Sequence, residues 1–500
     1  MYVIRLKIKQ TEYFNGLCEK RFALINRCHN ILVRRSMHLL NRLKHDRQYQ
    51  QLLDTYHSLD PGSKEARETG RQMNEYRKAL GLSKSGLESY IKVWQKRYSG
   101  HISSHQAQKE AERVMAGVEK VLFGNGKELH FRKLSQATTL CSKSPSNGVS
   151  FDRKNMTFRW MKDTFSLKPV DKDDIYMINA LYPDGNGPLP VSYCEIKRMM
   201  FPNGWHYYLN VYVKGTAPRK HMAGTGRAGI DPGTSTMAVY AEHKVMLRKL
   251  APEAEKYTTL LKEVLRAMDK SRRASNPDNY DPEGRVIKGR RTWRRSARYR
   301  ELERKFRSLC RRKALYIRQS HCILANEVLR NANEIIVEHM DYHSLQRKAK
   351  NTERQDRNSV IQDRKGRSKV IHKYKRKKRF GRSLGSRAPS EFLAILKQKA
   401  EASGGIYNEI DTKTFRASQY GHSEDTYTKT ALNERFKTIG GIEVQRDLYS
   451  AFLIQHSNDR YDSPDRQACI TDFAAFAVMH DKEIKHLKET GQSRPCCFGF

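Results

Sequence analysis

Residues 228–240 read AGIDPGTSTMAVY, and this stretch decides what kind of fold the chain can form. Small and apolar residues lead to one carboxylate, Asp231, and a Pro-Gly turn and an alternating run that ends at Tyr240 come after it. Such alternation is typical of a strand. A carboxylate in a buried strand must be paired, neutralised or bound to a cation, because the charged form is poorly solvated there. The stretch therefore predicts a strand that carries a functional acid.

Two further acids lie in unexpectedly apolar surroundings. Glu338 follows the apolar run of IIVEHM, and Asp447 lies near the start of the predicted helix VQRDLYSAFLI. Three converging carboxylates would repel one another unless a divalent metal held them. Oxygen-only ligation suits Mg²⁺, and two such ions about 3.5–4 Å apart can activate a water and stabilise the leaving oxygen of a phosphodiester. We therefore predict that Asp231, Glu338 and Asp447 are metal-binding and catalytic, with two Mg²⁺ ions or with Mn²⁺ in their place.

The composition indicates a nucleic-acid partner. The 500 residues include 95 Lys and Arg against 54 Asp and Glu, which gives a formal net charge of +41. A compact protein tolerates such a surplus best beside a polyanion. Ribosomal and other basic structural proteins share the bias, but they are usually shorter and poorer in apolar strands.

The location and the redox state can also be predicted. No apolar run is long enough for a spanning helix, and the charged start MYVIRLKIKQ is unlike a signal peptide, so we expect a cytoplasmic protein without a membrane partner. The nine cysteines show no Cys-x-x-Cys spacing. We therefore expect reduced, mostly buried thiols and no zinc site.

The first half of the chain alternates between strand and helix patterns. Residues 1–12 form a first strand, 13–127 a helical block, and 128–220 a set of strands that we expect to close with the first one into a small β-barrel. Within this last region, Asn203-Gly204 between two alternating runs predicts a hairpin.

The second half carries the acids. We expect residues 221–345 and 389–480 to form one α/β domain, interrupted by a basic loop over 346–388 and followed by a tail over 481–500. A long helix is predicted from about 293 to 332. Its charged faces and the basic loop are the predicted phosphate contacts: Arg298, Arg304, Arg307, Arg311, Lys373, Lys375, Arg376 and Lys377.

The order of motifs GIDPGTSTMAV, IIVEHMDY, FLAILKQKAEASGG, ASQYGH and VQRDLYSAFLI resembles the split RuvC nuclease domain of TnpB proteins and compact type V CRISPR effectors. The likeness is strongest over roughly 223–455. It implies a multidomain α/β and all-α protein with an RNase H-like (RuvC) nuclease domain, and a small wedge-like β-barrel with an inserted helical recognition domain. By motif, the family's three acids correspond to Asp231, Glu338 and Asp447.

This sequence departs from the family pattern at two places. Tyr449 stands where an Asn is usual, and Asp465 in SPDRQACITDFAAF is an alternative third acid; we prefer Asp447 because it follows ASQYGH in the family's order. Relatives commonly carry zinc-binding cysteine pairs in the loop that corresponds to about 412–443. Here only His422 remains, so we expect this degenerate zinc-finger-like loop to be held by packing. We interpret Asp341 as a turn residue.

The resemblance implies an RNA-guided DNA endonuclease. A guide RNA, from a transposon or a CRISPR array, would pair with target double-stranded DNA, and the first half of the chain would contact a short flanking motif. The single nuclease site would cut both strands in turn, with one or two protein copies per guide. Two alternatives remain: an RNA-guided DNA-binding protein that does not cleave, and a guide-free nuclease that selects DNA by its structure.

Overall fold

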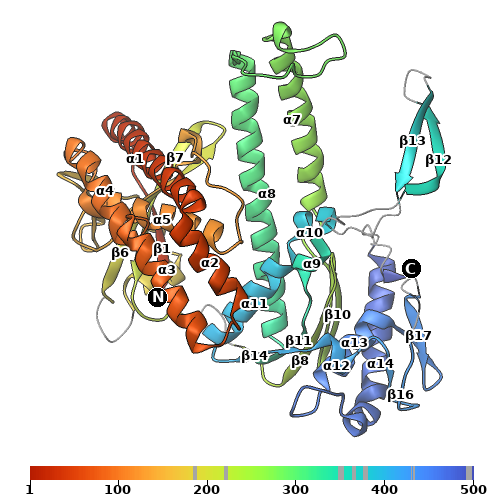
Figure 1. Cartoon of the computed structure of the whole chain (residues 1–500). Helices are drawn as coiled ribbons and strands as arrows, with labels where there is room; N and C mark the ends of the chain where they lie inside the picture. The colour runs from red at the N-terminus through yellow and green to blue at the C-terminus, as the bar shows by residue number, and fades with distance from the viewer. Residues whose placement is uncertain are drawn as a thin grey trace. The chain divides into compact units, whose positions relative to one another are not determined.

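The structure is a computed structural model that describes residues 1–183, 189–218, 223–346, 354–362, 368–374, 381–429, 431, 434–490 and 498–500. The chain divides into two compact units, Met1–Pro218 and Arg219–Phe500, whose elements are labelled in Figure 1. None of the helices in the described ranges is long and apolar enough to cross a membrane.

The helices of the first unit begin at capped positions. The side chains of Thr11, Asp46, Ser63, Ser83 and Ser103 each accept a hydrogen bond from a backbone N–H in the first turn, which satisfies a group that the helix leaves unpaired. The five helices that follow these caps are α1 (Glu12–His45), α2 (Arg47–Ser58), α3 (Lys64–Ala79), α4 (Lys84–Arg97) and α5 (Ser104–Leu122).

The main sheet of the first unit contains the predicted hairpin. Strands β6 (Val191–Phe201) and β7 (Gly204–Val213) pair antiparallel around the turn, where Gly204 adopts a φ of +118°. The first strand, β1 (Tyr2–Lys7), pairs with β7, and β2 (Thr139–Cys141) pairs with β6. The strand order is therefore β1-β7-β6-β2.

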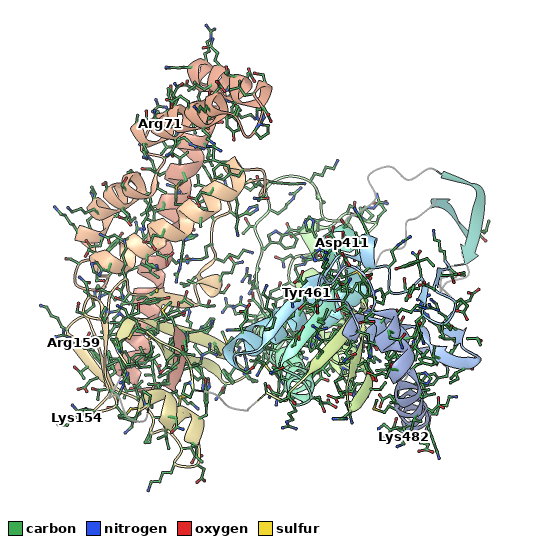
Figure 2. The ribbon with its side chains drawn as sticks, turned by 90° about the horizontal axis from the view of Figure 1, so that it is seen from below. Arg71, Lys154, Arg159, Asp411, Tyr461 and Lys482 are labelled. Carbon is green, nitrogen blue, oxygen red and sulfur yellow. The ribbon has the colours of Figure 1, made fainter. Side chains whose placement is uncertain are left out.

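The predicted small β-barrel is wrong for the described residues. The strands β3 (Val149–Asp152), β4 (Thr157–Trp160) and β5 (Asp163–Ser166) form a separate three-stranded sheet, and an isolated bridge pairs Ile8, just after β1, with Leu167, just after β5. Phe158 and Trp160 are buried, whereas Arg159 points outward (Figure 2). The edge strands β1 and β2 are not paired with each other, so the main sheet stays open. The short elements η1 (Leu134–Gln136) and α6 (Ile175–Leu181) complete the unit.

The second unit is built on a five-stranded mixed sheet. Its order is β10-β9-β8-β11-β14, where β8, β9 and β10 are antiparallel, β11 is parallel to β8 and β14 is parallel to β11. The bounds are β8 (Arg227–Pro232), β9 (Thr236–Ala241), β10 (Lys244–Lys249), β11 (Glu334–Glu338) and β14 (Ile406–Ile410).

Helices cover both faces of this sheet, as the fully buried strand β9 requires. Met237 and Val239 belong to the core cluster that includes residues of α8 (Ala297–Leu329) and α11 (Pro389–Ala402). Ala238 and Tyr240 belong to a second cluster, with residues of α13 (Arg446–Gln455) and α14 (Arg466–Glu489). Because successive strand residues point to opposite faces, one apolar strand stabilises two cores.

Two long helices leave the sheet side by side (Figure 1). They are α7 (Ala254–Ala274) and α8, and the 3-10 turn η2 (Pro277–Asn279) lies in their connection. The predicted helix over 293–332 is thus confirmed as α8. Side chains fix the connection, since the amide of Asn276 bonds to backbone groups of Arg272 and Arg294.

Two predictions for the C-terminal part need correction. The stretch 346–388 is not simply a loop, because it contains the antiparallel hairpin β12 (Arg354–Gln362) and β13 (Ser368–Tyr374) and the helix α10 (Gly381–Arg387). The range 481–500 is not simply a tail, because α14 continues to Glu489. The remaining short elements are α9 (Tyr342–Gln346), α12 (Thr412–Phe415), β15 (Tyr420–Gly421), β16 (Thr426–Tyr427), β17 (Phe436–Ile439) and β18 (Ile442–Gln445).

The cysteines of the described residues are all free thiols. Five of them are buried, Cys322 is half-buried and Cys310 is exposed. The buried five are Cys18, Cys28, Cys141, Cys194 and Cys469.

Candidate functional site

The structure brings the three predicted acids together on the second unit. Asp231 lies on β8 and Glu338 ends β11, its parallel neighbour. Val337 pairs with Ile230, so the next residue on each strand places Glu338 beside Asp231. Their carboxyl groups are close enough to share a hydrogen bond. Asp447 lies in the first turn of α13, close enough that its charge acts on both.

The contact between α13 and the sheet positions Asp447. Gly229 lies two residues before Asp231, and a Cβ on it would come within 2.2 Å of the Ala451 carbonyl oxygen and 2.3 Å of the Gln455 nitrogen. Only glycine allows this close approach. Gln445 caps the start of the helix, where its side chain accepts a hydrogen bond of 2.8 Å from the N–H of Leu448. The strand and the helix cap together fix where the third carboxylate lies.

The surroundings favour the protonated form of the first two acids. Burial raises the pKa of Asp231 well above its usual value, and the charges of Glu338 and Asp447 raise it further. Burial and, to a smaller extent, the charge of Asp447 raise the pKa of Glu338 to about 7, against the opposite effect of its hydrogen bond with Asp231. Two carboxyl groups can share a hydrogen bond only if one of them holds a proton. Without a cation, the fold therefore favours the pair in a protonated form over the doubly charged form.

Two arginines lie within ion-pair distance of Asp447. Its carboxylate lies 3.6 Å from Nε of Arg446 and 3.9 Å from Nη1 of Arg435. The side chain of Asp447 is 20% exposed, so it is accessible to a ligand. Sequence reasoning missed both arginines as site residues, although Arg446 stands directly before Asp447 in the RDLYSA motif.

The donor set suits a divalent cation, but its present arrangement does not complete a site. Clustered carboxylates that repel one another are the oxygen ligands that Mg²⁺ takes. Among the described residues, however, no group of three or more His, Cys, Asp or Glu side chains is arranged to hold a metal ion.

The two alternative acids have other roles. Asp465 caps α14, where its carboxylate accepts a hydrogen bond of 3.1 Å from the N–H of Ala468. Asp341 accepts hydrogen bonds from the N–H and the hydroxyl of Ser344, which lower its pKa. Both carboxylates thus stabilise local backbone.

A tyrosine that sequence reasoning missed supports the turn after Asp231. The hydroxyl of Tyr342 donates a hydrogen bond of 3.2 Å to the carbonyl of Gly233. Burial raises the pKa of Tyr342, and the charge of Asp231 raises it further. Tyr342 is the last residue of the IIVEHMDY motif, four residues after Glu338, but its spacing alone gives no signal for this contact.

Tyr449 and His422 explain how the loop over about 412–443 is held in the described residues. Tyr449 is fully buried, and its hydroxyl lies 2.8 Å from Nδ1 of His422 and accepts a hydrogen bond of 3.1 Å from the N–H of His422. The phenol thus anchors the loop to α13 at the position where the resemblance places an Asn. The ring of His422 also packs edge-on against Phe473.

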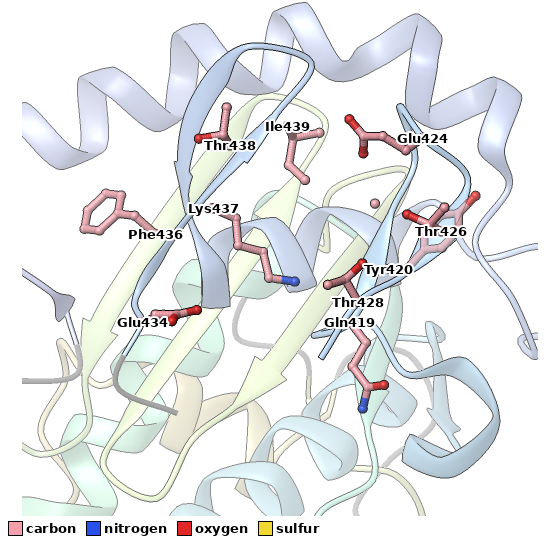
Figure 3. Close-up of a pocket in the computed structure, with 11 residues that line it drawn as sticks. Gln419, Tyr420, Glu424, Thr426, Thr428, Glu434, Phe436, Lys437, Thr438 and Ile439 are labelled. Carbon is pink, nitrogen blue, oxygen red and sulfur yellow. The ribbon is translucent and has the colours of Figure 1, made fainter. Parts of the chain in front are cut away.

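The same loop lines an open pocket of about 350 Å³ (Figure 3). Lys437 extends into it toward Thr428, and its ammonium donates a hydrogen bond to the carbonyl of Ser418. Burial, together with a smaller effect of the charge of Arg446, lowers the pKa of Lys437 to about 8. Sequence reasoning missed Lys437, which no motif distinguishes.

The predicted phosphate contacts on α8 differ in their surroundings. Arg298 pairs with Glu301 at 3.1 Å and Arg307 with Glu303 at 2.6 Å on the same helix. Arg304 is exposed and Arg311 is half-buried. The helix therefore mixes charge signs more than we expected. Lys373 lies on β13, and Lys375, Arg376 and Lys377 lie outside the described residues.

Comparisons with models of known protein families and with curated proteins give no match. Among solved structures, the chain is similar to one described as "Cryo-EM structure of CRISPR-Cas12f Ternary Complex". The sequence identity is 12%, the alignment covers 92% of this chain and 99% of that chain, and the TM-score is 0.24. At this score the likeness carries no structural conclusion, so the function must be inferred from the residues of this chain.

Proposed function

We propose that this chain is a metal-dependent nuclease whose second unit has an RNase H-like fold. The supporting observation is the meeting of Asp231, Glu338 and Asp447 from two adjacent parallel strands and a helix start. A sheet of three antiparallel strands continued by two parallel ones, with helices on both faces, is consistent with that fold.

The proposed substrate is DNA selected by a guide RNA. The support is the order of sequence motifs around the three acids, together with a net charge of +41 that favours polyanionic partners. The guide would supply the sequence specificity by base pairing, and the protein would bind the backbone of the heteroduplex.

The residues of the site would divide the chemistry among them. Bound Mg²⁺ ions would supply Lewis acidity for an in-line phosphodiester hydrolysis. Asp231 and Glu338 would lose their shared proton and hold the ions, and Asp447 would complete the ligand set. Tyr342 holds the turn after Asp231 through the carbonyl of Gly233, which keeps the first carboxylate in position.

One observation favours a second candidate, an RNA-guided DNA-binding protein that does not cleave. Asp447 is already in contact with Arg435 and Arg446. If those ion pairs persisted on DNA, the chain would bind its target without hydrolysis.

Purification of the full chain with its RNA tests the proposal. The bound RNA is sequenced, and matched double-stranded DNA is incubated with Mg²⁺. We expect cleavage that Asp231→Ala reduces by about 10²-fold or more, as is typical when one charge-stabilising group of a site is removed. Asp341→Asn, close to Glu338 but occupied with Ser344, is the control and should cleave normally.

Each other outcome identifies a different function. A defined RNA with tight target binding but no cleavage would indicate the binding protein. Cleavage of branched DNA without any bound RNA would indicate a guide-free nuclease. Normal cleavage by Asp231→Ala would contradict the proposed site itself.

A further inference from the structure

A cavity of about 550 Å³ lies on the first unit, far in the sequence from the three acids. Its walls come from α1, α4 and the segment after α5, and its volume is within the range of small-molecule sites. None of the residues that line it is acidic. In a chain that also contains 54 Asp and Glu, a pocket of aromatic and basic side chains indicates a ligand with a flat ring and a negative charge.

One wall of the pocket is held by a polar network around Arg132. Its carbonyl accepts hydrogen bonds from the amides of Asn26 (3.2 Å) and Asn30 (3.0 Å), and its N–H donates to the side-chain oxygen of Asn30 at 2.8 Å. Its guanidinium bonds to Asn26 and to the buried carboxylate of Glu110. Phe131, the preceding residue, is thereby fixed in the pocket wall although it is 51% exposed.

Two more aromatic rings come from α4. Tyr90 is 37% exposed and Trp94 is half-buried, whereas the core contacts of this helix are made by the fully buried Leu87 and Ile91. Guanidinium groups already lie over both rings, Arg35 at 5.2 Å from the centroid of Tyr90 and Arg97 at 4.9 Å from that of Trp94. Such rings offer faces on which a base can stack.

The charge of the pocket comes from α1. Arg27 and Arg34 both line the cavity and are exposed, and seven residues of spacing place them on the same helix face two turns apart. Neither forms an ion pair within the part of the chain that the structure describes. Exposed guanidinium groups without an acidic partner can bind phosphate oxygens in a bidentate manner.

We propose that this pocket binds one unpaired nucleotide of a single strand, with its base against Tyr90, Trp94 and Phe131 and its phosphates on Arg27 and Arg34. An acidic peptide would satisfy the arginines but would not need three aromatic rings, and an apolar ligand would leave both charges without a partner. Stacking tolerates any base, because every base has a π face. Ribose and deoxyribose strands share this chemistry and are distinguished by experiment.

The test uses the full chain in EDTA, so that cleavage plays no part and its outcome is separate from that of the proposed nuclease. The probe is a short single strand with one 2-aminopurine among abasic positions, made in ribo and deoxy forms. We expect its fluorescence to be quenched on binding. Trp94→Ala and Phe131→Ala should each weaken the affinity about ten-fold, since stacking of one base is worth about 1–3 kcal/mol.

Matched variants control for nonspecific charge and for misfolding. Phe123 is even more exposed than Phe131, at 65%, and does not line the pocket, so Phe123→Ala should leave the affinity unchanged. Trp94→Phe keeps a ring and should recover most of the loss. A combined Arg27→Gln, Arg34→Gln variant should bind more weakly and with a reduced salt dependence, whereas Arg71→Gln on α3 should not.

Photo-crosslinking keeps the proposal testable if a variant fails to fold. A single strand with one 5-iodouracil is crosslinked to the unaltered protein, and peptides with Tyr90, Trp94 or Phe131 are expected to carry the nucleotide. Crosslinks that map only elsewhere would overturn the proposal. Equal affinities for Trp94→Ala, Phe131→Ala and Phe123→Ala, or equal binding of a fully abasic strand, would also overturn it.

Discussion

The hydrogen bond between Asp231 and Glu338 is the residue-scale feature on which the proposed chemistry depends. The two carboxyl groups stabilise each other only while they share a proton, because two carboxylates would repel one another. Burial makes removal of that proton costly, since the charged form is poorly solvated. A divalent cation can take the place of the proton. The same two side chains therefore connect the stability of the fold to pH and to metal.

Without metal, this pair should make the protein less stable as the pH rises. The pKa of Glu338 is raised to about 7 and that of Asp231 is raised as well, so between pH 5 and 8 the folded chain binds more protons than the unfolded one. The contribution is fully present below the unfolded pKa of about 4 and is lost as the pH passes through 7. Thermal melts in EDTA across this range measure it.

Added Mg²⁺ should reverse this trend near pH 8, because a ligand that binds only the folded state stabilises it. The control is a variant with both Asp231→Asn and Glu338→Gln, which keeps the shape of the pair but removes its titration. The melting temperature of this variant should fall less steeply with rising pH than that of the unaltered protein, and it should not respond to Mg²⁺. An identical slope for both proteins would contradict the assigned pKa shifts.

Tyr449 gives a second prediction at this scale. Tyr449→Phe leaves the buried N–H of His422 without its acceptor, so we expect a loss of about 1–3 kcal/mol in the free energy of unfolding. Tyr449→Asn, which restores the residue usual in the family that the motifs resemble, opens a cavity in the core and should cost about 3–5 kcal/mol. Denaturant unfolding measures both. A gain in stability for the Asn variant would contradict the anchoring role of the phenol.

At the scale of elements, the contact between β8 and α13 determines where the third acid lies. In Gly229→Ala the new methyl would overlap the backbone of α13, so the helix must shift. We expect a loss of about 1–3 kcal/mol in stability, the usual cost of overpacking, together with a loss of cleavage because Asp447 moves. Gly16→Ala is the control, since α1 has open space at Gly16 and the change should be neutral or stabilising. Unchanged cleavage by Gly229→Ala would contradict the link between this contact and the site.

Local patterns predicted several elements well, and the reason is physical. The Asn203-Gly204 turn and helix α8 both follow from short-range rules of turn geometry and helical periodicity. Sheet closure depends on long-range pairing that no local pattern encodes, and the barrel prediction was wrong for this reason. The hairpin β12–β13 was missed because its residues show charge and little alternation.

The candidate site could be predicted only in part. Each of the three acids was identified by an apolar context that makes a carboxylate conspicuous. Arg435, which pairs with Asp447, lies just before β17, and Tyr342, which holds the turn after Asp231, begins α9; the positions of both depend on the folded sheet. The sequence therefore indicated where charge would be concentrated, but not which groups would compensate it.

At the scale of the whole molecule, the acids are each more than 100 residues apart, and only the assembled sheet brings them together. The net charge of +41 is likewise a property of the whole chain, and it produces a long-range attraction for polyanions. It would attract any nucleic acid at low salt, whereas the number of ions released on binding reports only the phosphates that the protein contacts. Salt dependence can therefore separate general attraction from a defined interface.

We predict that the arginines of α8 form part of such an interface. Replacing Arg298, Arg304, Arg307 and Arg311 together by Gln should lower the slope of log affinity against log salt by up to about 3–4, since each phosphate contact contributes about 0.7–0.9. We expect the slope to decrease by less than this maximum, because Arg298 and Arg307 are already paired with glutamates. Anisotropy titrations at several salt concentrations measure it.

The matched control removes the same charge from elsewhere. Arg71, Lys154, Arg159 and Lys482 are exposed and lie outside α8 (Figure 2), so replacing these four by Gln lowers the net charge equally. Long-range attraction would then weaken to a similar extent in both proteins, because it depends on total charge. Only direct contacts can make the α8 variant lose more slope than the control. Equal slopes for the two variants would show that α8 does not bind phosphates.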